Sequence, residues 1–424
     1  MRPAGFVIVM ALTAATAIAA VCAVNLATDP YYLFGLVRIA GFNQHKSQAG
    51  ERIQMAKAYL VARAHPHTLL IGNSRVEIGF DPQSPAWSAT GRPIFNLGVP
   101  GATMLVQRLY LEHALRRARP QTVIIGLDFT DFLLRPDIAS DVTPSEYRLL
   151  APGDRRRSAL WRDMVQGTLS LDTLWASMLT VAHQRDPWAP DMTEAGYNPL
   201  REYAAFAREE GYFGLFSQKY GELVRRYAAL PKTIDPPDDS LSIPMAQFRA
   251  MLEACISRGV KVILFVHPYH ADMLEILDAV GMWPAFEEWK RAMAAAAAEF
   301  SRPGYPIALW DFSGYHRWAT ETVPPPGDTS TTMRWYWEPA HYKASLGALM
   351  IARMFGGGDT AFGCQMEPST VDHCIELVRQ QREDFHRQYP NAAARLRPFL
   401  LQYKNFGSND TQQTPLVVDH KSTN

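Results

Sequence analysis

The chain has 424 residues, with 42 Lys or Arg and 42 Asp or Glu, so its formal net charge is zero. This balance argues against a nucleic-acid partner, since proteins that bind nucleic acid usually carry a basic excess. Hydrophobic residues make up 47% and charged residues 20%, a globular composition that suits one large domain with insertions or two domains.

Residues 1–30 are a candidate membrane anchor. The stretch from Ala4 to Ala27 contains no charged residue. Its 24 residues, at about 1.5 Å each, give about 36 Å and exceed the ~30 Å core of a bilayer. The alternative is a cleaved signal peptide, whose apolar core is usually shorter, at about 7–15 residues. We therefore expect an uncleaved, single-pass helix with the membrane as its partner.

The main domain is expected in the periplasm, with its anchor in the inner membrane. Positive charges are nearly balanced across the span, with Arg2 before it and Arg38 and Lys46 after it. The choice of side therefore rests on the short N-terminal tail and the lack of a second apolar span. Cys364 and Cys374 either form a disulfide or remain free thiols, and the disulfide fits an oxidising compartment.

The stretch from Thr68 to Gly72 is a short apolar run that predicts a buried strand. It ends at the turn pair Gly72-Asn73, and Ser74 follows at once. A serine between a strand and a helix lies at the carboxyl edge of a sheet, where open α/β folds bind their ligands. Ser74 is therefore either a nucleophile, with its own N–H facing a developing negative charge, or only a cap of the helix.

Four further strands are expected downstream, and they alternate with helices. This alternation predicts a three-layer α/β/α domain over residues 50–355, built on a five-stranded parallel sheet. Between about 129 and 244 the βα rhythm stops, and a stretch this long predicts a helical insertion that caps the site or binds a polymer. Residues 356–424 are expected to form one helix and a polar tail. The four strands are 93–97, 122–127, 260–266 and 306–310.

Glu338 and His341 lie three residues apart, just before a predicted helix. A serine nucleophile needs a histidine to accept its proton and a carboxylate to orient the imidazole. A carboxylate three residues before a histidine on a tight turn lies close enough to do so. Ser74, His341 and Glu338 are therefore the candidate catalytic residues.

These blocks, in this order, resemble those of the SGNH/GDSL-type hydrolases. The first block is Gly72-Asn73-Ser74, where the family usually has Gly-Asp-Ser, and the last is Glu338-x-x-His341, where it has Asp-x-x-His. The resemblance covers about 68–355 and implies the strand order 2-1-3-4-5. It also implies esterase or O-acyltransferase activity on acyl, in particular acetyl, esters of an exported polysaccharide.

The same resemblance implies an oxyanion hole made by Ser74, Gly98 and the residue at position 128. The family places an asparagine amide there, whereas this chain has Asp128. An ionised carboxylate donates no hydrogen bond. Asp128 therefore either donates as a protonated acid or turns away to orient neighbours such as His267 or the Ser74 loop, and we expect the second.

The remaining candidates are substrate-binding residues: Asn73 and Arg75, which flank the serine, and His267 at the end of the fourth strand. No cofactor and no metal site are expected; His267, His270 and Asp272 are a weak metal candidate, and the chain has no C-x-x-C pair. The alternative function is a catalytically weak scaffold that binds glycan or partner proteins of an export complex. Asn73 and Asp128, which depart from the family pattern, favour that alternative.

Overall fold

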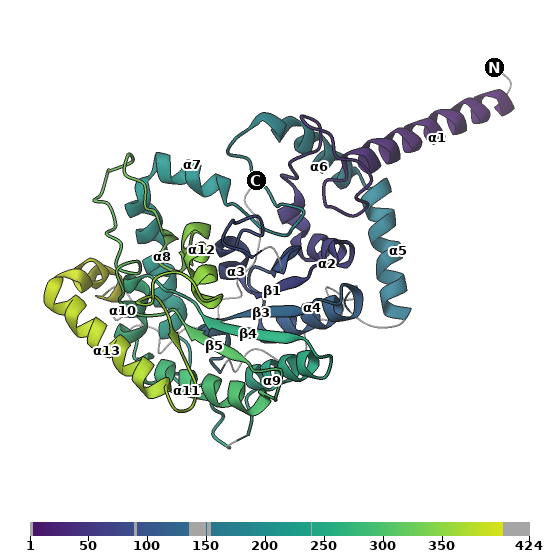
Figure 1. Ribbon diagram of the computed structural model, residues 1–424. Helices are drawn as coiled ribbons and strands as arrows, with labels where there is room; N and C mark the ends of the chain where they lie inside the picture. Colours follow the sequence, from purple (N-terminus) through teal and green to yellow (C-terminus); the bar gives the residue numbers. More distant parts are fainter. Residues whose placement is uncertain (1–2, 89–90, 135–149, 151–153, 239, 402–424) are drawn as a thin grey trace.

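The computed structural model describes residues 3–88, 91–134, 150, 154–238 and 240–401 (Figure 1). Its centre is a mostly parallel six-stranded sheet in the order β2-β1-β3-β4-β5-β8. The α/β class is therefore confirmed, and so is the order of the first five strands. Those strands are β1 (Thr68–Gly72), β2 (Ile94–Gly98), β3 (Thr122–Leu127), β4 (Lys261–Val266) and β5 (Ala308–Asp311).

The expectation of only five strands was wrong. A sixth strand, β8 (Cys364–Gln365), pairs antiparallel with β5, and Cys364 is joined to Cys374 by a disulfide. Two residues are too few to show a strand period in a sequence. The region after 355 therefore belongs in part to the sheet domain. Its helix α13 (Val371–Gln388) packs beside α11 (Trp283–Phe300), while the predicted polar tail from 406 onward lies outside the described residues.

Helices cover both faces of the sheet (Figure 1). On one face α4 (Met104–Arg117), α9 (Ile243–Ile256) and α11 pack in a row, and α2 (Ile53–Ala64) joins α4. On the other face α3 (Ser74–Gly79) contacts α12 (Ala344–Met354). The core of β1 is fully buried at Leu69, Leu70 and Ile71, as expected of a strand covered on both sides.

Helix α1 (Pro3–Thr28) projects away from the domain (Figure 1). In the described part of the chain it is the one helix long and apolar enough to cross a membrane. Its last turn is tied to the insertion: the Asn25 amide donates to the Thr168 and Ser170 carbonyls at 3.0 and 3.2 Å, and its oxygen accepts from Ser177 at 3.0 Å.

The predicted helical insertion is present as four α-helices in its described part. They are α5 (Asp154–Leu169), α6 (Leu171–Ala182), α7 (Arg201–Glu209) and α8 (Gly211–Ala228). Helices α5 and α6 pack at the base of α1, whereas α8 packs against the short hairpin of β6 (Tyr336–Glu338) and β7 (His341–Tyr342) and against α10 (Ala271–Ala279). The insertion therefore connects the apolar helix to the carboxyl edge of the sheet.

Candidate active site

Ser74 lies where β1 gives way to α3. Asn73 caps the helix, because its side-chain oxygen accepts from the Arg75 N–H at 3.0 Å. Ser74 is then the first residue of α3, where a backbone N–H has no partner within the helix. The paired strands β1 and β2 end side by side at Gly72 and Gly98, which places the serine at the carboxyl edge of the sheet.

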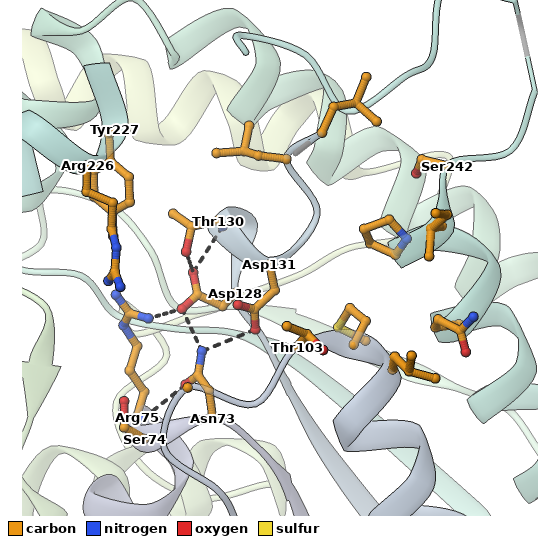
Figure 2. Close-up of a pocket in the computed structure, with 18 of the residues that line it drawn as sticks. Asn73, Ser74, Arg75, Thr103, Asp128, Thr130, Asp131, Arg226, Tyr227 and Ser242 are labelled. Carbon is orange, nitrogen blue, oxygen red and sulfur yellow. Dashed lines mark hydrogen bonds and ion pairs between the residues drawn. The ribbon is translucent and has the colours of Figure 1, made fainter. Parts of the chain in front are cut away.

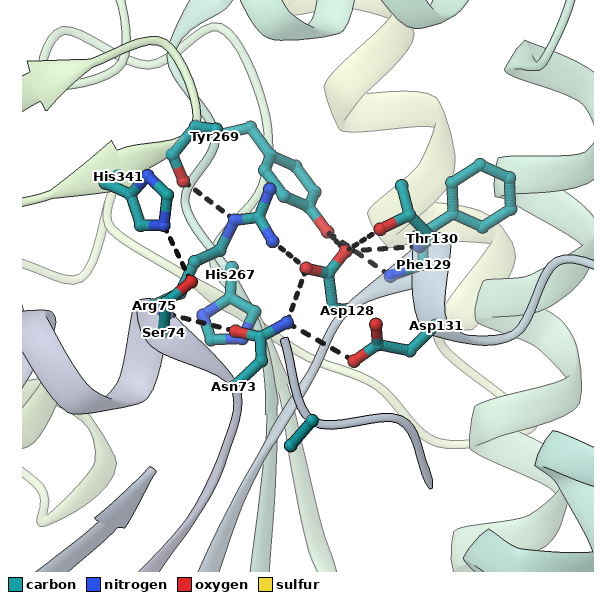
Figure 3. Close-up of polar contacts among 12 residues, drawn as sticks. Asn73, Ser74, Arg75, Asp128, Phe129, Thr130, Asp131, His267, Tyr269 and His341 are labelled. Carbon is teal, nitrogen blue, oxygen red and sulfur yellow. Dashed lines mark hydrogen bonds and ion pairs between the residues drawn. The ribbon is translucent and has the colours of Figure 1, made fainter. Parts of the chain in front are cut away.

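Ser74, His341 and Glu338 form a hydrogen-bonded chain. The Ser74 Oγ lies 2.8 Å from the His341 Nε2 (Figure 3), and the His341 Nδ1 hydrogen-bonds to the Glu338 Oε1. Because Nδ1 donates to the carboxylate, Nε2 is left to accept the serine proton. The predicted trio is thus brought together with the geometry of a nucleophile, its base and an orienting acid.

The β6–β7 hairpin holds the acid and the base. Glu338 and His341 are register partners across its turn, and the second Glu338 oxygen accepts from the Ala340 N–H at 2.8 Å. Burial raises the pKa of Glu338, but the nearby His341 and these hydrogen bonds outweigh burial and leave the pKa below its usual value. Glu338 is therefore charged, as an acid that orients a histidine must be.

Arg75 links the serine loop to the histidine hairpin. Its Nε donates to the Ala340 carbonyl at 2.7 Å, its Nη1 pairs with Asp128, and its guanidinium lies 5.2 Å from the centre of the Tyr269 ring. Arg75 is buried, so its charge is shielded from water and depends on Asp128. Arg75, which follows Ser74, thereby holds Ala340, which precedes His341.

Asp128 is the centre of this polar network (Figure 3). Besides Arg75 it accepts from the Asn73 amide at 2.8 Å, the Tyr269 hydroxyl at 3.0 Å, and the Thr130 N–H and hydroxyl at 3.1 and 3.0 Å. All of these groups can donate, so Asp128 acts as an acceptor. The geometry therefore gives no support to Asp128 as an oxyanion donor and agrees with the expectation that it orients its neighbours, although His267 is not among them.

The geometry gives no support to the expected oxyanion role of Gly98 either. Its N–H donates to the Asn96 side chain at 3.0 Å, and a Cβ added to it would lie 2.4 Å from the Glu77 nitrogen in α3. Gly98 is thus a glycine because α3 packs directly on it. Gly101, three residues on, lines the same cavity as Ser74, and its N–H donates to no other described residue.

His267 is the third residue whose expected role is not supported. It is fully buried, its Nδ1 hydrogen-bonds to the Tyr342 hydroxyl at 3.0 Å, and it does not line the cavity. Burial, together with the charges of Arg75 and His341, lowers its pKa well below the usual value, so the ring is neutral. Asn73 and Arg75 do line the cavity, but their polar atoms are bound to the Asp128 network.

The cavity beside Ser74 measures about 470 Å³, within the range of small-molecule sites. Figure 2 shows Arg226 and Tyr227 on one side of its polar groups and Ser242 on the other. Sequence reasoning missed the α8 residues and the apolar wall, because only the fold brings the insertion to the sheet edge. The wall comprises Met104, Leu105, Leu133, Leu134, Leu223, Pro236, Leu241, Ile243 and Pro244.

The weak metal candidate has other partners. His270 caps α10 by accepting from the Asp272 N–H at 3.1 Å, and its Nε2 lies 2.8 Å from the Glu321 carbonyl oxygen. Among the described residues no cluster of His, Cys, Asp and Glu is arranged to hold a metal ion.

Comparison of the chain with protein-family models and with curated proteins gives no match.

Proposed function

We propose that the protein is a serine esterase or O-acyltransferase that uses Ser74 as nucleophile, His341 as base and Glu338 as orienting acid. The observation that carries this proposal is the hydrogen-bonded chain from the Ser74 Oγ to the His341 Nε2, at 2.8 Å, and on to Glu338. The resemblance of the Gly72-Asn73-Ser74 and Glu338-x-x-His341 blocks to SGNH-type hydrolases supports the same reading.

The reaction proceeds through an acyl-enzyme. The Ser74 Oγ attacks the ester carbonyl while the His341 Nε2 accepts its proton, and the charged Glu338 stabilises the resulting imidazolium. The imidazolium then returns the proton to the leaving alkoxide as the C–O bond breaks. Water or a second hydroxyl attacks the acyl-enzyme in the same way, which yields hydrolysis or transfer. The N–H groups of Ser74 and Gly101 are the proposed oxyanion donors.

The apolar wall of the cavity is the proposed binding place for the acyl group. Leu133 and Leu223 are almost completely buried and lie in the same cavity as Ser74. Burial of one methylene is worth about 0.8 kcal/mol, so kcat/KM for nitrophenyl esters should rise about fourfold per added carbon until the wall is filled. Leu223→Ala should flatten this rise; a preference for acetate in both proteins would contradict it.

The proposed alcohol part of the ester is a hydroxyl of an extracytoplasmic polysaccharide, as in the SGNH-type enzymes that act on acetylated glycans. The apolar wall favours an acyl group longer than the acetyl group that the resemblance implies. The proposed location is the inner membrane, with the domain in the periplasm. Helix α1 supports the anchor, and the Cys364–Cys374 disulfide fits an oxidising compartment. A reporter fused after Asn424 should be active only when exported; activity confined to the cytoplasm would refute this orientation.

A fluorophosphonate probe on the purified full-length protein tests the chemistry. The wild type should be labelled, and Ser74→Ala should abolish the labelling. Ser242→Ala is the matched control, because Ser242 lines the same cavity, and it should be labelled like the wild type. Absence of labelling at every pH would instead favour a glycan- or protein-binding scaffold, the second candidate, which the acceptor-only Asp128 at the family's amide position favours.

A further inference from the structure

Helix α6 carries its apolar residues on the wrong side for a helix of a water-soluble domain. The face that it buries against the protein is small and polar, with Thr173, Ala176, Ser177 and Thr180. Its exposed face is large and apolar, with exposures of 72% at Leu171, 60% at Trp175, 48% at Met178 and 37% at Val181. Soluble helices normally show the reverse pattern. The exposed face of α6 is therefore expected to contact an apolar environment rather than water.

A second exposed apolar group follows α1 in the chain. Leu36, Val37 and Ile39 are about half to two thirds exposed. Their segment is folded back onto the end of α1, because the Asn43 amide donates to the Ala27 and Val37 carbonyls at 2.7 and 2.9 Å. Both apolar groups are thus attached to the last turn of the same helix.

The contacts of α6 place it at the same level along α1. Ser177 and the Ser170 carbonyl hold Asn25, and Ala176 packs against Tyr31 and Leu33 directly after the helix. Helix α1 has 26 residues and is about 39 Å long, about 9 Å more than a bilayer core. Since Asn25 lies in its last turn, that excess places α6 at the headgroup boundary, where α6 meets α1 in Figure 1.

We propose that the exposed face of α6, together with Leu36, Val37 and Ile39, is a second contact with the lipid bilayer, in which α6 lies flat in the interface. Interfacial helices bury their apolar face about 5–10 Å deep, and Trp is favoured at the headgroup level. Lipid is the proposed occupant because this surface continues from α1, whose own side chains around the span are exposed. A single anchoring helix leaves a domain free to swivel, whereas two contacts fix the height and direction of the cavity.

The test uses the full chain in nanodiscs of phosphatidylcholine. Cys22 is replaced by Ala, the buried Cys255 is kept, and an environment-sensitive NBD label is attached at Leu171→Cys or Met178→Cys. The matched control is Leu377→Cys, an exposed leucine of α13 on the far side of the domain (Figure 1). The two α6 labels should emit at shorter wavelength and lose most of their emission when doxyl-labelled phosphatidylcholine is included, while the control should do neither.

Emission at both α6 positions that matches the control would overturn the proposal. A blue shift without doxyl quenching would also overturn it, because the face would then be covered by protein, either a partner or a second copy. Trp175→Glu provides an independent check, since it should reduce the quenching at Leu171→Cys while the fluorophosphonate labelling of Ser74 persists. Loss of that labelling in Trp175→Glu would show a folding defect, and Met178→Glu then takes its place in the same test.

Discussion

The substitution Asp128→Asn bears most directly on the proposed site, since it keeps the size of the side chain and replaces one acceptor oxygen by an amide donor. In the wild type, Asp128 Oδ2 pairs with Arg75 and accepts a hydrogen bond from Asn73. Its Oδ1 accepts hydrogen bonds from Tyr269 and Thr130. The substitution also installs the asparagine that SGNH-type enzymes have at this position. If that amide alone mattered, the variant would gain activity; if the network matters, it loses both activity and stability.

The magnitude follows from the donors that surround the side chain. With its NH2 toward Arg75 and Asn73, the new amide faces two donors and leaves the buried guanidinium unpaired. With its NH2 toward Thr130, it faces the Thr130 N–H, which cannot reverse its role. A buried donor without a partner costs about 1–3 kcal/mol, and breaking a buried ion pair costs about 3–5 kcal/mol. We therefore expect Asp128→Asn to lower the free energy of unfolding by about 3–5 kcal/mol.

Urea denaturation followed by circular dichroism measures this loss, and fluorophosphonate labelling measures the state of Ser74. Because Arg75 also holds the Ala340 carbonyl next to His341, labelling should slow in Asp128→Asn even below the unfolding midpoint. The matched control is Asp131→Asn, whose Oδ2 accepts from the amides of Asn73 and Gln107 and should cost less. An Asp128→Asn protein as stable as the wild type, or more reactive, would refute the reasoning.

Three further substitutions test other parts of the structure. Gly98→Ala places a Cβ 2.4 Å from the Glu77 nitrogen, so urea denaturation should show a loss of about 1–3 kcal/mol, with Gly50→Ala, which meets open space, as the neutral control. The pKa of Glu338 in the folded protein is below its unfolded value. Its contribution to the free energy of unfolding is therefore fully present above about pH 4.3 and is lost as the pH falls through the folded pKa. Glu338→Gln should remove this loss of stability at low pH and lower turnover by up to about 10⁴-fold. An unchanged dependence of stability on pH would contradict this. Cys364 and Cys374, ten residues apart, should be linked in non-reducing peptide maps, and replacing both by Ser should cost about 2.7 kcal/mol; two free thiols in exported protein would contradict this.

The parts of the site that the sequence predicted are those encoded by short, local patterns. Gly72-Asn73-Ser74 follows an apolar run, and Glu338-x-x-His341 brings acid and base together within one tight turn. Each pattern determines the local backbone conformation, and the parallel strands then place Ser74 at the carboxyl edge of the sheet. The same locality explains why the insertion could be predicted to be helical, as α5 and α7 are.

The residues that were missed, or whose expected role finds no support in the geometry, depend on contacts between distant parts of the chain. Nothing near Asp128 reveals that Arg75 neutralises it, and nothing near Leu223 reveals that α8 lines the cavity. Two glycines stand in the run from Asn96 to Gly101, and only the packing of α3 shows which one is needed for space. His267 follows a strand like other site residues, yet Tyr342 holds it in the core.

The separation of Ser74 from His341 along the chain has a consequence for biosynthesis. Ser74 and His341 lie 267 residues apart, and translation at about 5–20 residues per second takes roughly 13–53 s to cover that distance. A chain that emerges with its N-terminus first therefore carries an unactivated serine until the β6–β7 hairpin is made and docks. The Arg75–Ala340 hydrogen bond joins the two parts only at that last step. The proposed catalytic trio is therefore incomplete until the last part of the domain has been made and has docked.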